Sequence, residues 1–338
     1  MALLEIENLS VEFATASGVL RAVENLTLSL RTGDILGVVG ESGSGKSVSM
    51  LAVMGLIPYP GRVTTGRITF DGHDILVLSG RKRRQILGKD LAMVFQDPAT
   101  SLDPCFTVGF QLTETLRAHE GLDRRHATRR AIELLEQVGI PDAESRLGSF
   151  PHQLSGGMNQ RVMIAIAIAC NPKLLIADEP TTALDVTIQA QILDLLLSLQ
   201  RERGMALILV THNMGVVADI AHRVAVMYAG EIMEEAHVTA LFTTPQHPYT
   251  AALLAARPEH SHGGRFATIP GTVPGLHDRP AGCLFGPRCS FATPRTCSIR
   301  PELRHFMDAR VRCHYPLGDT TRDRRIAQDR QTAVERPS

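Results

Sequence analysis

The sequence predicts an α/β fold with a parallel sheet core, an antiparallel β layer, a helical subdomain and a small irregular Cys-rich C-terminal extension. Three observations predict it. Short apolar runs without alternation, each followed by a helical pattern, are typical of buried parallel strands. The N-terminal residues alternate instead, which is typical of an antiparallel layer. A stretch of helical periodicity separates the apolar runs, and 338 residues are enough for one α/β domain with an appendage.

The strands are predicted first. Val11 and Phe13 alternate with polar residues, as do Ile68 and Phe70 before an Asp-Gly turn, and this pattern predicts the antiparallel layer. The parallel strands are predicted from the runs ILGVV, LLIA and ALILV, at residues 35–39, 174–177 and 206–210.

The segment from about 97 to 157 is predicted to be the helical subdomain. In ATRRAIELLEQVGI, residues Ile132, Leu135 and Val138 recur at helical spacing, and Gly139 supplies the stop.

Three parts are expected along the chain. The first domain should occupy residues 1–250, since Gly, Pro and His accumulate after it. The extension should occupy residues 251–317. Residues 318–338 have too little apolar content to pack, so we expect a disordered tail there.

Composition limits the classes of function. Lys plus Arg equals Asp plus Glu, at 35 each, so no net field favours binding to nucleic acid. The N-terminus carries acidic residues where a secretory signal needs a basic start. No apolar run approaches the roughly 18 residues that span a bilayer. We therefore expect a cytosolic protein. If it works at a membrane, a partner must anchor it there.

The sequence GESGSGKS fits the phosphate-binding pattern G-x-x-x-x-G-K-S/T and follows the predicted strand 35–39. Its backbone N–H groups are expected to face nucleotide phosphates, with Lys46 reaching the β- and γ-phosphates and the Ser47 hydroxyl ligating Mg²⁺. The pattern predicts a P-loop NTPase that binds ATP. The nucleotide-binding residues of this loop are Gly40, Glu41, Ser42, Gly43, Ser44, Gly45, Lys46 and Ser47. The loop is expected to need no contact with the extension in order to form.

Two adjacent carboxylates end the apolar run of LLIADE. Asp178 is expected to hold Mg²⁺ through water, and Glu179 to orient the attacking water as the catalytic residue. Buried neighbouring carboxylates are costly without a cation, which favours this interpretation.

LSGGMNQR, from Leu154 to Arg161, places Ser155 and two glycines before a helical apolar run. This makes a second helix N-terminus with free N–H donors, and hence a second phosphate-binding surface. One nucleotide has no use for two such surfaces in one chain.

These residues resemble the signature sequence of ABC transporter ATPases. The resemblance implies that Ser155, Gly156 and Gly157, together with Gln160, close over ATP held by an opposite subunit. The ATP site would then be complete only in a dimer.

Other family landmarks occur in the expected order. Gln96 in MVFQDP resembles the Q-loop glutamine, which implies that it contacts Mg²⁺ and has a catalytic role. ALD, from Ala183 to Asp185, resembles the D-loop at the nucleotide, and His212 in LVTHN resembles the catalytic switch histidine near the γ-phosphate. Phe13 is the candidate for stacking on adenine, with core packing as the alternative.

Longer stretches resemble the ATPase subunits of peptide/nickel ABC importers, above all the dipeptide and oligopeptide permeases. They are VFQDPATSLDP, PQHPYTAALLAA and the run from FPHQLSGG to ILDLL, and the resemblance extends to about residue 317. It implies two permease subunits, an extracytoplasmic peptide-binding protein, a second ATPase that is commonly non-identical, and a peripheral position on the cytoplasmic face of the plasma (inner) membrane. The alternatives are an importer of nickel, glutathione or oligosaccharide, or a soluble ABC ATPase outside transport.

Four cysteines crowd the extension: Cys283, Cys289, Cys297 and Cys313. Their irregular spacing contains no C-x-x-C pair, so a zinc ribbon is not favoured. Nearby arginines are expected to lower the thiol pKa values and favour ligated thiolates, namely Arg288, Arg295, Arg300, Arg310 and Arg312.

In the family that this chain resembles, the equivalent extension binds a 4Fe–4S cluster, which implies that these four cysteines are its ligands, with His314 as a possible substitute. Zinc and unligated thiols are the alternatives. A cluster would be either a structural staple or a redox or iron sensor. Cys105 and Cys170 are expected to be small buried hydrophobes of the core.

Overall fold

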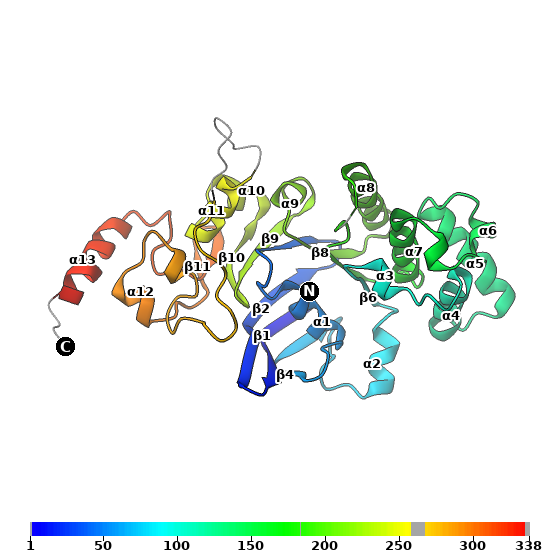
Figure 1. The fold of residues 1–338 in the computed structure, drawn as a ribbon, viewed down its shortest axis with the longest axis horizontal. Helices are drawn as coiled ribbons and strands as arrows, with labels where there is room; N and C mark the ends of the chain where they lie inside the picture. Colours follow the sequence, from blue (N-terminus) through cyan, green and yellow to red (C-terminus); the bar gives the residue numbers. More distant parts are fainter. Residues whose placement is uncertain (1, 183, 258–267, 335–338) are drawn as a thin grey trace. The chain divides into compact units, whose positions relative to one another are not determined.

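The computed structural model describes residues 2–182, 184–257 and 268–334 (Figure 1). The chain divides into two compact units, which we call unit 1 and unit 2 and describe separately. Unit 1 comprises Met1–Leu4, Leu30–Asp34 and Thr69–Val210, and unit 2 comprises Glu5–Ser29, Ile35–Ile68 and Thr211–Ser338. Among the residues that the structure describes, no helix combines the length and the apolar character that a membrane span requires.

The core of unit 1 is a set of buried parallel strands: β6 (Leu91–Val94), β7 (Leu174–Asp178) and β8 (Ala206–Thr211). β7 pairs with both neighbours, so Leu174 lies opposite Leu91 on one side and Ala206 on the other. The prediction of parallel strands at 174–177 and 206–210 is confirmed. Every residue of these strands is buried, which explains their continuous apolar sequence.

Helices make up the segment of unit 1 that was predicted to be helical. α4 (Val108–Glu120), α5 (Arg124–Gln137) and α7 (Gly156–Ile168) pack on one another, and Figure 1 shows α6 (Ala143–Arg146) beside them. Thr107 and Asp123 cap α4 and α5 through their side chains, which fixes where each helix begins. The remaining elements of this unit are β5 (His73–Asp74), α2 (Gly80–Ile86), α3 (Pro98–Ser101), the 3₁₀ helix η1 (Pro151–Gln153) and α8 (Val186–Arg203).

Unit 2 holds most of the predicted antiparallel layer, in which β1 (Ala2–Thr15) lies between β2 (Gly18–Arg31) and β4 (Gly61–Phe70). Two residues join β1 to β2, which makes them a hairpin. A second group of strands begins with β3 (Ile35–Val39), which is parallel to β9 (Arg223–Tyr228). The predicted strand at 35–39 is therefore confirmed.

The extension contains regular structure that the sequence did not predict. β11 (Arg304–Phe306) and β12 (Ala309–Val311) form a hairpin, and β12 pairs with β10 (Glu231–His237), which is antiparallel to β9. These strands are short, so their pattern in the sequence is weak. The other helices of unit 2 are α1 (Lys46–Met54), α9 (Met214–Ile220), α10 (Val238–Thr243), α11 (Pro248–Ala255), η3 (Gly286–Arg288) and α12 (Pro294–Ser298).

The prediction of a disordered tail is wrong for α13, which spans Arg322–Val334. Ile326 is buried, and the Arg325 guanidinium bonds the carboxylate of Asp319 at 2.8 Å and the carbonyl oxygen of His314 at 3.1 Å. A few specific contacts therefore dock a helix whose overall composition is strongly polar.

Candidate functional site

The glycine-rich loop lies in unit 2 between β3 and α1, as its pattern requires. A Cβ atom on Gly40 would lie 2.2 Å from the carbonyl oxygen of Met227, so only glycine fits there. Gly45 has φ of 94° and caps α1, a conformation that favours glycine. Residues Gly40 to Ser47 thus form the expected turn into a helix N-terminus, where N–H groups attract phosphate.

Lys46 is held within this loop. Its side chain is buried, and its ammonium donates to the carbonyl oxygens of Gly40 at 2.8 Å and Glu41 at 3.0 Å, and to the hydroxyl of Ser44 at 3.4 Å. These acceptors compensate a charge that would otherwise be costly to bury. Phosphate oxygens can accept hydrogen bonds from the same ammonium. Lys46 therefore lies where the predicted phosphate site needs a positive charge.

The loop contacts the extension, and that it needs no such contact in order to form stays a prediction. Arg288 of the extension forms an ion pair with Glu41, at 3.0 Å between Nη1 and Oε1. The amide of Gly230 also donates to the carbonyl oxygen of Ser44 at 2.8 Å. Neither contact is visible in the loop's own sequence.

In unit 1, the structure brings Gln96 to Glu179. β6 and β7 are parallel with Val94 opposite Ala177, so the residues after both strands emerge at the same edge of the sheet. Glu179 Oε2 accepts from Nε2 of Gln96 at 3.3 Å and from the hydroxyl of Thr182 at 2.9 Å. Thr182 was not predicted, and its place three residues after Glu179 is the signal that could have found it.

Asp178 and Glu179 differ in exposure and backbone. Asp178 is buried at the end of β7, whereas Glu179 is half-buried and has φ of 45°. A left-handed conformation is uncommon for glutamate and is found where a site constrains the backbone. Asp178, Ser47 and Gln96 carry oxygen atoms, the type of ligand that Mg²⁺ prefers.

The predicted signature residues stand at the start of α7. The Ser155 hydroxyl caps this helix by accepting from the amide of Met158 at 3.3 Å, and both Ser155 and Gly156 are exposed. Gly157 is close-packed, because a Cβ atom there would lie 3.1 Å from Cγ2 of Ile188. Gln160 is only 1% exposed, so its side chain does not belong to the surface that Ser155 presents.

The other predicted residues occupy separate places. Asp185 caps α8 by accepting from the amide of Ile188 at 2.9 Å, and Ala183 lies outside the described residues. His212 is exposed directly after β8. Phe13 is half-buried against Gly61, since a Cβ atom on Gly61 would lie 2.5 Å from its ring. Its stacking on adenine stays a prediction.

Comparison with known proteins identifies this arrangement. Residues 23–182 match the family model for ABC transporters, and residues 233–297 match that for the C-terminal region of oligopeptide/dipeptide transporters. The dipeptide transport ATP-binding protein DppD of Escherichia coli strain K12 is 56% identical over 324 residues, covering 95% of this chain and 99% of that protein. This chain belongs to the ABC transporter ATPase family.

Other relatives agree with this assignment. DppD of Haemophilus influenzae is 54% identical to this ABC ATPase, covering 94% of this chain and 97% of that protein. The oligopeptide transport ATP-binding protein OppD of Bacillus subtilis is 51% identical, covering 86% and 82%. A solved dimeric ATP-binding cassette bound to ADP and Pi has a TM-score of 0.63 and 28% identity, covering 70% of this chain and 98% of that chain. The predicted fold class and ATPase activity are therefore confirmed.

The extension of this ABC ATPase brings three of the four cysteines around one cavity. Cys283, Cys289 and Cys313 line it, with His314 among the other lining residues, whereas Cys297 is exposed and is not part of the lining. The cavity measures about 10 Å³, about the space of one water. No group of His, Cys, Asp or Glu in the described ranges is arranged to hold a metal ion. The described residues therefore show no preformed cluster or zinc site, and both stay predictions.

The expectation of lowered thiol pKa values is wrong for the three cysteines that line the cavity. Burial raises the pKa of Cys283 to about 11 and raises those of Cys289 and Cys313 as well. Two of the expected arginines pair with carboxylates instead, Arg288 with Glu41 and Arg310 with Glu235. Desolvation of the thiolate therefore dominates at these cysteines.

The two cysteines expected in the core behave differently. Cys170 is buried, and burial raises its pKa to about 11, as expected for an inert core thiol. Cys105 is exposed, so its expected burial is wrong. It follows α3 in an irregular stretch where the sequence gives no periodic signal.

Proposed function

We propose that this ABC ATPase powers the import of dipeptides or oligopeptides through partner permease subunits. The observation that carries the proposal is the identity of 56% to a dipeptide transport ATP-binding protein over nearly the whole of both chains. Support comes from the P-loop geometry around Lys46 and from the contact between Gln96 and Glu179.

In the proposed mechanism, the P-loop amides and Lys46 bind the phosphates of ATP, which is the substrate. Ser47, Asp178 and Gln96 would hold Mg²⁺, which supplies charge neutralisation to the phosphates. Glu179 orients the attacking water and accepts its proton, and Thr182 fixes the glutamate rotamer by donating to Oε2 at 2.9 Å.

Several residues complete the proposed site. His212 would contact the γ-phosphate, Asp185 would position the segment before α8, and Phe13 would stack on adenine. Ser155, Gly156 and Gly157 would contact ATP bound by a second, non-identical ATPase subunit. The exposure of Ser155 and Gly156 supports this role, because a surface that binds in trans must be open in the single chain.

We propose that the permease subunits dock on the segment after Gln96. Phe106 and Phe110 there are 44% and 50% exposed, and their rings stack with centroids 4.5 Å apart. Two large exposed aromatic rings side by side are typical of an interface. Docking would hold the protein on the cytoplasmic face of the plasma (inner) membrane, and an extracytoplasmic peptide-binding protein would deliver cargo to the permease.

Reconstitution of the complete transporter tests the function. Vesicles that contain the permease, both ATPases and the binding protein should take up labelled dipeptide when ATP is supplied. Matched assays with nickel, glutathione and an oligosaccharide test the alternative cargoes. Uptake of one of these in place of peptide would overturn the proposal that peptides are the cargo. ATP hydrolysis that never responds to the permease would favour a soluble ABC ATPase.

We also propose that Cys283, Cys289, Cys297 and Cys313 would hold a 4Fe–4S cluster, as the resemblance to peptide-importer ATPases implies. The gathering of three thiols around one cavity supports it. Anaerobically purified protein should be brown, with about four irons per chain. Changing any of the four cysteines to Ser should remove the colour, whereas Cys105→Ser and Cys170→Ser should retain it. Stoichiometric zinc in colourless protein would contradict the cluster and favour zinc.

A further inference from the structure

The Cys-rich extension contacts the P-loop through one guanidinium. Arg288 ends η3, on the stretch between Cys283 and Cys289. Its Nη1 lies 3.0 Å and 3.2 Å from the two carboxylate oxygens of Glu41, and its Nη2 lies 3.2 Å from Oε2. Glu41 is the second residue of GESGSGKS, so this ion pair joins the extension directly to the phosphate-binding loop.

Arg288 is fixed by contacts on the side of the extension. Its Nε donates to the carbonyl oxygen of Pro270 at 2.8 Å, and its Nη2 donates to that of Ile269 at 3.3 Å. The guanidinium also lies over the rings of Tyr228 and Phe285, at 5.7 Å and 6.0 Å from their centroids. The Arg288 side chain is only 5% exposed and that of Glu41 is 28% exposed, so the ion pair is shielded from water mainly on the arginine side.

Glu41 is fixed from the other side through its backbone. Its amide donates to the hydroxyl of Tyr249 at 3.0 Å, and its carbonyl oxygen accepts from Lys46 at 3.0 Å. Burial raises the pKa of Tyr249, so this hydroxyl stays neutral. Both the backbone and the side chain of Glu41 are therefore held.

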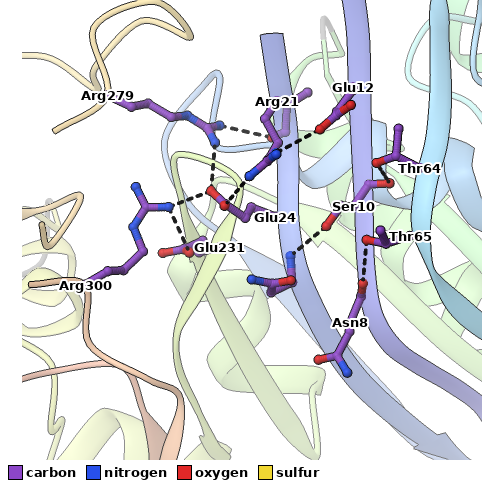
Figure 2. Close-up of polar contacts among 12 residues, drawn as sticks. Asn8, Ser10, Glu12, Arg21, Glu24, Thr64, Thr65, Glu231, Arg279 and Arg300 are labelled. Atoms are coloured by element: carbon purple, nitrogen blue, oxygen red, sulfur yellow. Dashed lines mark hydrogen bonds and ion pairs between the residues drawn. The ribbon is translucent and has the colours of Figure 1, made fainter. Parts of the chain in front are cut away.

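A second set of ion pairs ties the extension to β2. Figure 2 shows Glu24 facing Arg300 and Arg279, and Arg300 facing Glu231 as well. The ion pairs of Glu24 measure 2.6 Å to Arg300 and 3.9 Å to Arg279, and the pair of Arg300 with Glu231 measures 3.7 Å. The amide of Glu24 donates to the carbonyl oxygen of Gly230 at 3.0 Å. The amide of Gly230 donates to the carbonyl oxygen of Ser44 at 2.8 Å, so this connection ends on the second half of the P-loop.

We propose that Arg288 is a positioning residue for nucleotide binding, which neutralises Glu41 and so allows ATP phosphates to enter the P-loop. A glutamate in this loop brings a negative charge close to the site of a polyanion. Bidentate pairing with a buried arginine offsets that charge and fixes the loop. The extension thus sets nucleotide affinity, and the proposal rests on the assignment of Gly40 to Ser47 as the nucleotide loop.

A double-mutant cycle on the full chain tests the proposal by direct titration with ATP and ADP. Arg288→Met should weaken ATP binding by about tenfold or more, since it leaves an unpaired carboxylate beside the phosphates. In the background of Glu41→Gln, the same Arg288→Met change should weaken binding by no more than about twofold, because no unpaired charge remains. In the assembled transporter, Arg288→Met should raise KM with little effect on kcat.

Arg304→Met is the matched control. It removes the same charge from an exposed position of the same extension and should leave ATP affinity as in the unaltered chain. Equal affinities of Arg288→Met and the control, or an equal loss with and without Glu41→Gln, would overturn the proposal. Failure of the unaltered chain and the control to bind nucleotide would instead overturn the nucleotide loop itself.

Discussion

Two loops of this ABC ATPase precede helices and present glycines, yet they are held very differently. The P-loop before α1 is held by Lys46 from within, and by Arg288 and Tyr249 through Glu41. The signature loop before α7 is exposed at Ser155 and Gly156. One loop is therefore ready to bind phosphate, and the other is open on the side that a partner would cover.

The difference indicates how work is divided between the two loops. A loop that binds nucleotide in the single chain gains affinity if its geometry is fixed beforehand. A loop that acts only after dimerisation must stay on the surface. The comparison predicts that changes at the P-loop alter binding in the single chain, whereas changes at the signature loop alter hydrolysis by the dimer.

The largest effect is expected at neither loop but at Glu179, the carboxylate that we propose to orient the attacking water. Glu179→Gln should lower ATP turnover by about a hundredfold or more, because one positioned general base contributes that much. ATP binding should persist, which would trap a closed dimer detectable by size-exclusion chromatography. Asp194→Asn, an exposed carboxylate on α8, is the matched control. Near-normal turnover by the purified Glu179→Gln complex would contradict the assignment of Glu179 as the catalytic residue.

The P-loop itself should show a large effect on binding. Lys46→Ala should weaken ATP binding by the single chain about 10- to 100-fold, since charged hydrogen bonds to phosphate contribute about 1.5–3 kcal/mol. Lys82→Ala removes an exposed lysine and should leave the dissociation constant as it was. Equal dissociation constants for the two variants in a titration would contradict the role of Lys46 in ATP binding.

The signature loop should show the reverse behaviour. Gly157→Leu places a side chain where Ile188 already lies 3.1 Å from the position of a Cβ atom. Hydrolysis by the dimer should fall about tenfold or more, because overpacking of about 1–3 kcal/mol displaces the loop. The single chain should still bind ATP, and Gly157→Ala should show a smaller loss. An equal fall in single-chain binding would contradict action in trans.

Much of this architecture follows from local sequence. The strands of residues 35–39, 174–177 and 206–210 were predictable because burial on both faces makes them continuously apolar. The P-loop was predictable because Gly40 and Gly45 occupy positions that side chains cannot. The contact of Gln96 with Glu179 follows from the parallel pairing of β6 and β7.

The rest depends on contacts between residues far apart in the sequence. β12 exists because it pairs with β10, and α13 docks through Ile326 and Arg325 rather than through an apolar stripe. The arginines near the cysteines were expected to lower thiol pKa values, yet Arg288 reaches Glu41 instead. Sequence distance does not show which carboxylate an arginine meets, and the link between the extension and the P-loop was therefore missed.

The smallest effect separates two roles of Ser155. Its hydroxyl caps α7, so Ser155→Ala should lower the free energy of unfolding of the single chain by about 1 kcal/mol. Ser155→Asp retains an acceptor for the amide of Met158 and should keep that stability, as measured by urea denaturation. Its negative charge would face the partner's ATP, however, so hydrolysis by the dimer should fall with Asp as well as with Ala. If Asp restores hydrolysis together with stability, Ser155 is only a helix cap, and the signature loop has no direct contact with phosphate.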